Sequence, residues 1–580
     1  MIRRILNSRL PLMVYTPVKV FDVGYFHDIY AAGALPVLDT EFLTHGDILQ
    51  KALQLAGENL SFGIRLSSHD RDLIGKIKQQ QMINLDLIIC PISKNDDPAD
   101  FSHFSDTKIV LEIKDIHIND KIKAVSPHAL ILKGNEAGGK VSKYSSFILM
   151  QWYLKNTDYP VFIHGGVGKY TAAGMFSAGV SGLVMDSQLL MADEAPVSKN
   201  FKTLLAMLDE SDSTDITYNG DDIYRVFAKL GTKIVKDLKI KAVELGADPD
   251  GKEKLYDLIS THMTAFDSEA APFIQSLFFL GQDGVFAKDF VKESTRLGDI
   301  ISGFFKTIGE NLNFIDSHDP VKPDSPFAKD QGTRFPLIQG PMANISDSSE
   351  FANKILEHGA LPFFAVGSLP ESLADKMLKD GAENVPVFGA GLVGIEAFNP
   401  MVKKHLDMVK KYKAPYALFA GGIPSQAAEL EKAGTKTYLH TPSVSMMENA
   451  IKSGCRRFIF EGGEAGGHVG MLSSLVLWED AVATLINKNY EVSDLYLVFA
   501  GGIATCFASF FISGLTSFLA ARGAKIGIQV GTVYLFADEI VKPGVSSRNT
   551  GTSSSGKTKP WSSAKAWDSL PGPLPRNLPG

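Results

Sequence analysis

The chain has 580 residues, of which 45% are hydrophobic, and its formal net charge is −7. This length is too great for one ordinary domain, and the apolar content is enough to build large cores. A net charge this small for the size gives no indication of a nucleic-acid partner or of an anionic membrane surface.

The amino-terminal region does not have the pattern of a signal peptide, because polar residues at positions 7–9 interrupt its apolar residues. The three cysteines have neither zinc-binding nor redox spacing, which suits a reducing compartment; they are Cys90, Cys455 and Cys506. We therefore expect a cytoplasmic protein whose cysteines are small core residues.

Residues 1–212 contain eight short apolar runs with the length of buried strands. They are Leu12–Tyr15, Leu35–Leu38, Ser61–Ile64, Leu87–Cys90, Lys108–Glu112, Ala129–Lys133, Val161–His164 and Gly182–Met185. A helix-like segment at Val197–Asp209 could close the series. We expect these residues to form a first parallel barrel.

Residues 213–330 have few strand signals and several amphipathic stretches, including Ile223–Leu238 and Glu253–Phe266. We interpret this region as a helical connector that partly covers one barrel. Its last part, Asp316–Gly332, has the prolines, glycines and mixed charges of a linker.

Residues 331–544 contain a second series of eight apolar runs. They are Leu337–Gln339, Leu361–Val366, Val385–Phe388, Tyr416–Ala420, Lys436–Leu439, Arg457–Phe460, Leu495–Phe499 and Lys525–Val530. Helix-like segments lie between most of them, at Ser349–His358, Pro400–Tyr412, Ser425–Lys432 and Ser443–Ser453. This alternation predicts an α/β fold of two tandem (β/α)8 TIM-type barrels joined by the connector.

After Pro543 the composition changes to serine, glycine, proline and lysine, and residues 545–580 are expected to form a disordered low-complexity tail. Gly551–Thr558 in this tail fits the P-loop pattern. The pattern needs a buried strand before it and a helix after it, whereas polar sequence precedes it here and Pro560 follows. Nucleotide hydrolysis is therefore not expected.

Three glycine-rich turns follow the sixth, seventh and eighth strands of the second series. They are Glu464-Ala465-Gly466-Gly467-His468, Ala500-Gly501-Gly502-Ile503 and Gly531-Thr532. Parallel barrels that bind a phosphate usually do so with the loops after strands seven and eight. Glycine also allows the backbone to come close to a flat ligand.

Together with Pro336-Leu337-Ile338-Gln339-Gly340-Pro341-Met342-Ala343, these turns resemble the nitronate monooxygenase (2-nitropropane dioxygenase) family of FMN barrels, which also includes flavin-type enoyl reductases. The order of the four motifs matches that family from Pro336 to Thr532. The continuation from Val469-Gly470 to Trp478-Glu479 is similar to members fused to polyketide or polyunsaturated fatty acid synthases.

The resemblance implies a role for each motif. Pro341 and Met342 would line the isoalloxazine ring, Gly466 and Gly467 would leave room beside it, and His468 would be the catalytic acid or base. The phosphate of FMN would lie against Gly501, Gly502, Gly531 and Thr532. His440 stands where familiar members have a glutamine facing the flavin, and Gly389-Ala390-Gly391 stands where many have an asparagine.

Three functions remain open at this point. The first is an FMN-dependent nitronate monooxygenase acting on a small nitroalkane or nitronate. The second is an enoyl reductase module of a synthase, with NADPH or NADH as electron donor and an enoyl thioester delivered by an acyl carrier protein. The third is a non-catalytic tandem barrel used for assembly.

The first barrel repeats the motif order, but with changes that disfavour FMN. Lys140 stands where the second barrel has His468, and a lysine normally stays protonated. Asp186-Ser187 stands where the second barrel has Gly531-Thr532, and a carboxylate there would repel a phosphate. We therefore expect residues 1–212 to be a degenerate barrel with a scaffolding or docking role.

Three further patterns favour no function. Leu495 to Ala521 has no charged residue, but glycines, serines and threonines break it where a barrel needs a turn, so no membrane span is expected. Gly389–Gly394 fits a dinucleotide fingerprint but lacks an acidic residue after the next strand, and is better interpreted as a glycine-rich loop. His440, Glu461, Glu464 and His468 lack the spacing of metal ligands, so no metal is expected.

Overall fold

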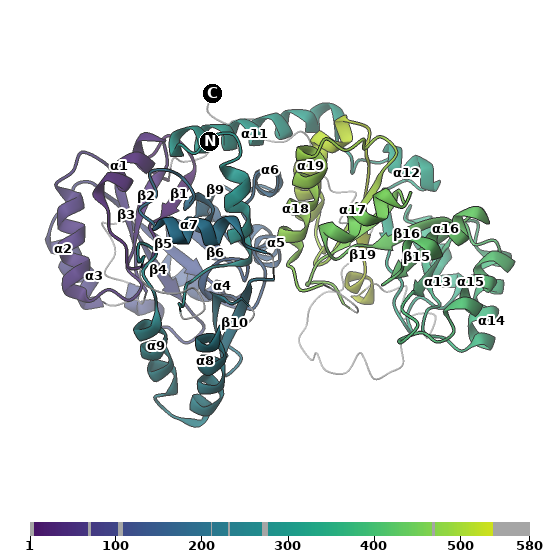
Figure 1. Ribbon diagram of the computed structural model, residues 1–580, viewed down its shortest axis with the longest axis horizontal. Helices are drawn as coiled ribbons and strands as arrows, with labels where there is room; N and C mark the ends of the chain where they lie inside the picture. Colours follow the sequence, from purple (N-terminus) through teal and green to yellow (C-terminus); the bar gives the residue numbers. More distant parts are fainter. Residues whose placement is uncertain are drawn as a thin grey trace. The chain divides into compact units, whose positions relative to one another are not determined.

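The computed structural model describes residues 5–67, 71–101, 108–209, 211–229, 232–269, 276–466 and 470–536. The chain divides into two compact units, residues 1–308 and 309–580 (Figure 1). The predicted tail, with its P-loop pattern, lies outside the described residues, as do Gly467 and His468.

Unit 1 is built on a closed barrel of eight strands, with parallel pairing between neighbours. The strands are β1 (Leu12–Tyr15), β2 (Leu35–Asp39), β3 (Phe62–Arg65), β4 (Leu85–Ile92), β5 (Ile109–Ile113), β6 (Ala129–Lys133), β8 (Val161–His164) and β9 (Gly182–Met185). Each agrees with a predicted run to within two residues at either end. The first barrel is therefore confirmed.

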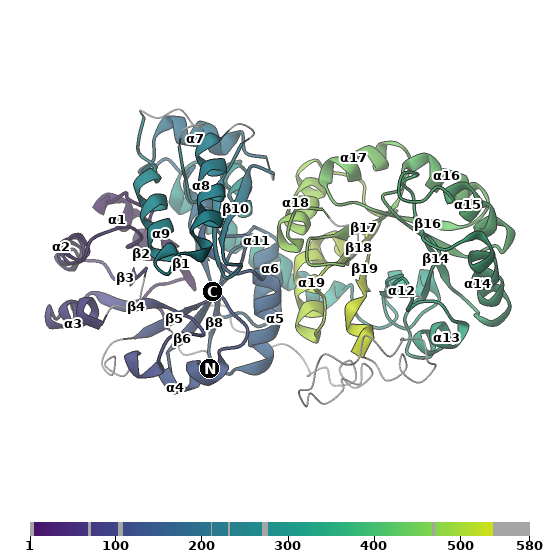
Figure 2. The same ribbon diagram turned by 90° about the horizontal axis from the view of Figure 1, so that it is seen from below.

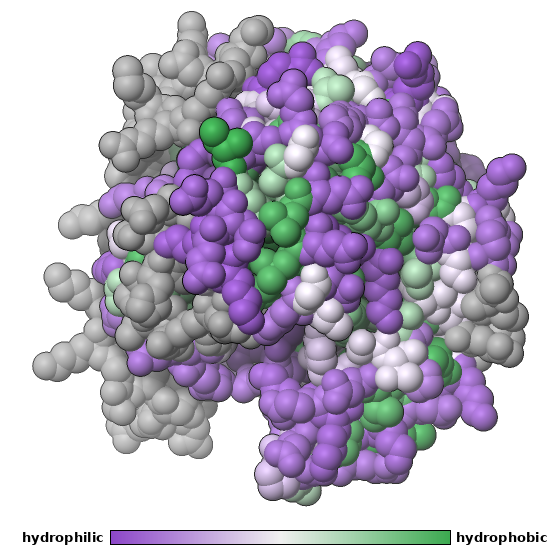
Figure 3. Space-filling model, turned by 90° about the vertical axis from the view of Figure 1, so that its left-hand side faces the viewer, coloured by the Kyte–Doolittle hydropathy of each residue, from purple (hydrophilic) through white to green (hydrophobic). Residues whose placement is uncertain are grey.

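Helices alternate with these strands and turn one apolar stripe toward the barrel. They are α1 (Val23–Ala31), α2 (His45–Ala56), α3 (Arg71–Gln79), α4 (Asn119–Val125), α5 (Ser146–Asn156), α6 (Thr171–Ser177) and α7 (Lys199–Ala206). In α2, Ile48, Ala52 and Leu55 are buried, at helical spacing, and Thr44 caps the first turn. The face of the molecule shown in Figure 3 is mainly hydrophilic, with apolar residues in small separate patches.

The rest of unit 1 contains a hairpin as well as helices. Strands β10 (Ser213–Tyr218) and β11 (Asp222–Phe227) pair antiparallel, and β11 also pairs with β7 (Gly139–Val141). Helices α8 (Lys233–Glu244), α9 (Gly251–His262), α10 (Ala287–Phe290) and α11 (Leu297–His318) follow. An amphipathic stretch was expected in the helical connector at Ile223–Leu238, but its first residues belong to β11. The overlooked signal is Asn219-Gly220, whose positive φ angles are typical of a hairpin turn.

This connector covers the carboxyl end of the first barrel. Val18, in the loop after β1, packs into a core formed largely by β10, β11, α8 and α9. The hydroxyl of Tyr256 donates a hydrogen bond of 2.9 Å to Glu41, and Lys19 donates one of 2.7 Å to the carbonyl of Ser260. Residues of the connector thus contact the loops at the carboxyl end of the first barrel.

Unit 2 holds the second eight-stranded parallel sheet, which also curls into a barrel. Its strands are β12 (Leu337–Gln339), β13 (Phe363–Ala365), β14 (Gly389–Val393), β15 (Tyr416–Ala420), β16 (Lys436–His440), β17 (Arg457–Glu461), β18 (Tyr496–Ala500) and β19 (Lys525–Val530). Between β12 and β13 there is one isolated bridge, Ile338 to Leu361, so this barrel is nearly closed.

Helices form a ring around these strands (Figure 2). They are α13 (Ser349–Glu357), α14 (Glu371–Asn384), α15 (Val402–Lys411), α16 (Pro424–Lys432), α17 (Val444–Lys452), α18 (Ser474–Asn487) and α19 (Cys506–Ala521), with α12 (Pro326–Gln331) ahead of the first strand and the 3-10 helix η6 (Thr532–Phe536) after the last. The two tandem TIM-type barrels are thus confirmed.

The uncharged stretch from Leu495 to Ala521 is a strand, a turn and a helix. It comprises β18, the Gly501-Gly502 turn and α19. Among the described residues, no helix has both the length and the apolar character needed to cross a bilayer.

The third strand of the second barrel differs from the prediction. Val385–Phe388 was expected to be the strand and Gly389–Gly394 a loop, but the strand is β14, Gly389–Val393. The glycines are needed within the strand: a Cβ on Gly389 would lie 2.2 Å from the ring of Phe363, and one on Gly391 would lie 2.4 Å from Pro341. The fingerprint pattern therefore reflects packing across the barrel.

We predict that Gly389→Ala destabilises unit 2 by about 1–3 kcal/mol, because the new methyl group has no space beside Phe363. Gly309→Ala is the matched control, since Gly309 lies in α11 and a Cβ there meets nothing within 4 Å. Thermal unfolding should show a lowered transition for the first variant and an unchanged or raised one for the second. Equal transitions for Gly389→Ala and the parent would contradict the packing described.

Candidate functional site

The carboxyl ends of the second barrel's strands carry small residues on their inward side. Every second residue of a strand faces the barrel interior, as Ile338, Leu418 and Ile459 do in its core. Following this alternation to the strand ends gives eight inward positions: Gly340, Ala365, Gly391, Ala420, His440, Glu461, Ala500 and Gly531. Glycine and alanine fill all but two of these eight positions, although Val393 of β14 and Gln529 of β19 also face inward by the same alternation.

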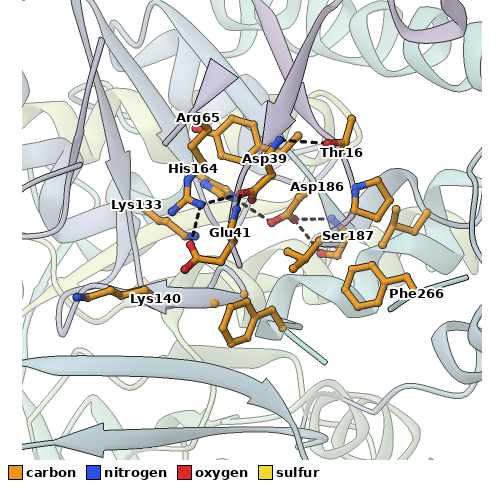
Figure 4. A pocket seen from close by; sticks show the side chains of 17 residues that line it. Thr16, Asp39, Glu41, Arg65, Lys133, Lys140, His164, Asp186, Ser187 and Phe266 are labelled. Atoms are coloured by element: carbon orange, nitrogen blue, oxygen red, sulfur yellow. Dashed lines mark hydrogen bonds and ion pairs between the residues drawn. The ribbon is translucent and has the colours of Figure 1, made fainter. Parts of the chain in front are cut away.

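The strand registers identify the corresponding positions of the first barrel. Asp39 pairs with Arg65 as Ala365 pairs with Gly391, and Lys133 pairs with His164 as Glu461 pairs with Ala500. The whole set is Tyr15, Asp39, Arg65, Pro91, Glu112, Lys133, His164 and Asp186. Large and ionisable side chains therefore fill the positions that hold mostly glycine and alanine in the second barrel (Figure 4).

The two ionisable residues of the second set face each other. His440 ends β16 and Glu461 ends β17, and Nδ1 of the histidine lies 2.7 Å from a carboxylate oxygen of Glu461. Both side chains are nine-tenths buried or nearly so. Nε2 of His440 is buried and has no hydrogen-bond partner among the described residues. This nitrogen is therefore available to a ligand at the barrel's end.

A glutamate and a serine connect the turn after β17 with the turn after β18. Glu464 accepts hydrogen bonds from both the backbone N–H (2.7 Å) and the hydroxyl (2.6 Å) of Ser474, the first residue of α18. The same hydroxyl lies 3.3 Å from the carbonyl of Gly501, to which it can also donate. Gly501 has a φ of +111°, and a Cβ on it would lie 2.5 Å from that hydroxyl oxygen. The turn after β18 therefore requires glycine.

Sequence reasoning gave Glu464 no structural role and missed Ser474. The signal was present as a repeat, because Glu136 and Ser146 stand ten residues apart in the first barrel just as Glu464 and Ser474 do in the second. Glu136 accepts from the backbone N–H of Ser146 at 2.9 Å. Gly165 there has a φ of +115°, close to that of Gly501.

Pro341 and Met342 lie in the loop after β12. This loop contacts Gly391 of β14 on one side and approaches Gly531, after β19, on the other. Pro341 packs on Gly391 of β14, and the sulfur of Met342 lies 4.0 Å from the position of a Cβ on Gly531. Thr532 begins η6 directly after Gly531 and is exposed. The structure thus brings Pro341, Met342, Gly531 and Thr532 together, next to the Gly501-Gly502 turn of the neighbouring strand.

The third predicted turn is only partly described. Gly466 is exposed, and a Cβ on it would meet nothing within 4 Å. Gly467 and the predicted catalytic residue His468 lie outside the described residues, so their roles stay predictions.

In the first barrel, this type of glycine turn donates a hydrogen bond to a carboxyl group of the chain itself. The backbone N–H of Gly166 donates a 3.0 Å hydrogen bond to the carboxylate of Asp283, which comes from the 3-10 helix η5 (Gln282–Phe286). The φ angles of Gly166 and Gly502 are +69° and +70°. In unit 1 a carboxylate of the chain itself therefore lies where a cofactor phosphate would approach the turn.

Lys140 does not lie free over the first barrel's end. It belongs to β7 and forms an ion pair of 2.5 Å with Asp222 of β11. Burial lowers the pKa of Lys140, although the neighbouring Asp222 acts in the opposite direction. This pairing gives the lysine a structural role in the three-stranded sheet.

Residues 370–558 match the family model described as nitronate monooxygenase. No curated protein sequence matches the chain. Among solved structures, FabK from Thermotoga maritima is similar over 54% of this chain and 97% of its own, with 14% identity and a TM-score of 0.46. The enoyl reductase domain of MlnA from Bacillus amyloliquefaciens is similar over 52% and 95%, with 12% identity and a TM-score of 0.40. A nitroalkane oxidase from Streptomyces ansochromogenes is similar over 37% and 69%, with 21% identity and a TM-score of 0.30.

We predict that Glu464→Ala lowers the stability of unit 2 by about 1–3 kcal/mol, because the buried N–H and hydroxyl of Ser474 lose their shared acceptor. Glu464→Gln keeps an acceptor oxygen and should lose less. Thermal unfolding of both variants is the measurement. A larger loss for the glutamine variant than for the alanine variant would contradict this role.

Asp283 gives a prediction about pH. Burial, and then the charge of Asp186, raise its pKa well above the usual value. Between the unfolded-state pKa of about 3.9 and this raised value, the folded state binds more protons, so the free energy of unfolding falls as pH rises. Asp283→Asn keeps the acceptor for Gly166 and removes this dependence.

The melting temperature of Asp283→Asn relative to the parent should therefore rise as pH increases from about 4 to 7. Asp250→Asn, at an exposed position in the same unit, is the control. A pH series of calorimetric melts measures both. A difference that stays constant or falls with pH would show that the Asp283 carboxyl is not held in a raised-pKa state.

Proposed function

From the nitronate monooxygenase family domain at residues 370–558, we propose that this protein is an FMN-dependent oxidoreductase of the nitronate monooxygenase type, acting through its second barrel. The observation that carries this proposal is the set of glycines and alanines at the inward strand ends of that barrel. A flat cofactor needs such a place, whereas the first barrel fills the same positions with large and mostly ionisable side chains.

The residues present fit FMN in two respects. The buried Nε2 of His440 has no partner among the described residues and could hydrogen-bond to the ring. The Gly501-Gly502 turn has the backbone shape that binds a carboxylate in unit 1, and Gly531 and Thr532 end the next strand. FMN, when bound, supplies the redox step, and the protein supplies its position and the movement of protons.

His468 is the residue that we propose for proton transfer. Histidine titrates near neutral pH, which suits it to take a proton from the substrate carbon that bears the nitro group. In an enoyl reductase the same residue would deliver a proton to the substrate.

A second candidate is an enoyl thioester reductase with NADPH or NADH as donor, and exposed apolar side chains favour it. Phe398, Ile423, Met446 and Met471 are 66%, 55%, 41% and 81% exposed. Phe398, Ile423 and Met471 lie in the loops after β14, β15 and β17. Met446 lies in the first turn of α17, which follows β16. An acyl chain would gain about 25 cal/mol for each Å² of apolar surface that it covers there.

We predict that His468→Ala lowers turnover on the order of a hundred- to ten-thousand-fold, the usual contribution of general acid–base catalysis. The variant should keep bound flavin, because the residue acts on the substrate. Steady-state rates and the flavin absorption spectrum of the same preparation measure the two effects. Loss of flavin together with activity would make His468 a structural residue instead.

The full-length protein tests the proposal and separates its alternatives. Purified protein should be yellow and contain one FMN per chain. If added NADPH bleaches the flavin without oxygen and an enoyl thioester restores the colour, the enoyl reductase is correct. If oxygen with a nitronate supports turnover, the nitronate monooxygenase is correct. Colourless protein that takes up no FMN would leave the third interpretation, a non-catalytic tandem-barrel scaffold.

A further inference from the structure

A separate pocket lies at the carboxyl end of the first barrel, beneath the connector. Its volume is about 30 Å³, which is room for a few atoms but not for a flavin. Figure 4 shows that Arg65, Glu41 and Lys133 enter it from neighbouring parts of the barrel. These side chains come from the unit that the family match does not cover.

Lys133 makes no direct contact with an acceptor among the described residues that line this pocket. It ends β6 and is 4% exposed. Within the described part of the chain, its ammonium group makes no hydrogen bond and no ion pair with any carboxylate. Its charge is attracted by the nearby carboxylates of Asp39, Glu112 and Asp186. A buried ammonium whose N–H groups make no direct hydrogen bond is still costly, so a ligand that supplies an acceptor would be favoured here.

The nearby carboxylates are already bound to other groups. Arg65 is fully buried and binds Glu112 through two nitrogens, at 2.8 and 3.1 Å. It also binds Asp39 at 2.9 Å and Glu41 at 3.0 Å. Lys114 also forms an ion pair with Glu112, at 2.8 Å. The acidic side chains of this cluster are therefore turned toward Arg65 rather than Lys133.

The remaining carboxylate of the pocket, Asp186, is also occupied. One of its oxygens lies 3.0 Å from Nε2 of His164, and the other accepts the hydroxyl of Ser187 at 3.0 Å. In contrast, the buried hydroxyl of Tyr15 has no hydrogen-bond partner among the described residues. Two donors, the Tyr15 hydroxyl and the Lys133 ammonium, thus lie at one pocket without an acceptor.

We propose that this pocket binds a small carboxylate, with the Lys133 ammonium and the Tyr15 hydroxyl as its hydrogen-bond donors. Ammonium and hydroxyl groups are both satisfied by carboxylate oxygens, and charge-assisted hydrogen bonds of this kind are strong. The site is independent of the flavin site, because the second barrel has Glu461 at the position of Lys133 and Gly340 at that of Tyr15.

Calorimetric titration of the full-length protein at constant ionic strength, with acetate, glycolate and pyruvate as probes, tests this site. At least one probe should bind saturably, and acetamide, which lacks the charge, should not. Lys133→Met should weaken binding about tenfold or more, as expected for loss of a charged hydrogen bond. Lys123→Met, at an exposed position on α4, should bind as the parent does.

Lys133→Gln serves as a second variant in case the methionine variant does not fold, and it should also weaken binding. Flavin content should be the same in all variants, which separates this site from the proposed function of the second barrel. Equal binding by the Lys133 variants and the parent, equal binding of acetamide and acetate, or no saturable binding of any probe would each overturn the proposal.

Discussion

Both barrels depend on one local interaction, in which a glutamate binds the first turn of a helix and fixes two glycine turns. In the second barrel Glu464 binds Ser474, whose hydroxyl lies against Gly501. In the first, Glu136 binds Ser146, which lies against Gly165. Because the buried donors of the serine would be costly to leave unpaired, the turns after the sixth and seventh strands are held in one geometry. The rest of each site is built around these turns.

The two barrels share these turns but differ in the side chains at the carboxyl ends of their strands. The second keeps glycine or alanine at most of the eight inward positions, and Nδ1 of His440 lies 2.7 Å from Glu461. The first has Glu112 and Lys133 at those two positions, so the carboxylate stands on the fifth strand there and on the sixth strand in the second barrel. The space needed by a flat cofactor is therefore present in one barrel and occupied by side chains in the other. A duplicated fold can separate two kinds of site in this way without changing its strand order.

The fold could be predicted from sequence because each strand is a short apolar run between helices, and Leu12–Tyr15 and Lys525–Val530 were predicted with their observed bounds. The strand Gly389–Val393 was misplaced because its glycines are set by the ring of Phe363, a contact distant in sequence. The glycine turns and Pro341-Met342 could be predicted because positive φ angles and close backbone contacts restrict which residue types can occupy these positions. The buried cluster around Arg65 was not predicted. Which charged residues at the strand ends lie side by side depends on the pairing register of the strands, and the sequence alone does not give that register.

The hydrogen bond from Gly166 to Asp283 bears on where the first domain ends. Residues 1–212 contain all eight strands of the first barrel. The carboxyl group that accepts a hydrogen bond from Gly166, in the turn after β8, belongs to Asp283, about seventy residues beyond position 212. Val18 likewise packs against strands and helices that lie beyond that point. A nascent chain would therefore carry an incomplete first barrel until the connector had been synthesised. Residues 1–308 are better regarded as one cooperative folding unit than as a barrel followed by a spacer.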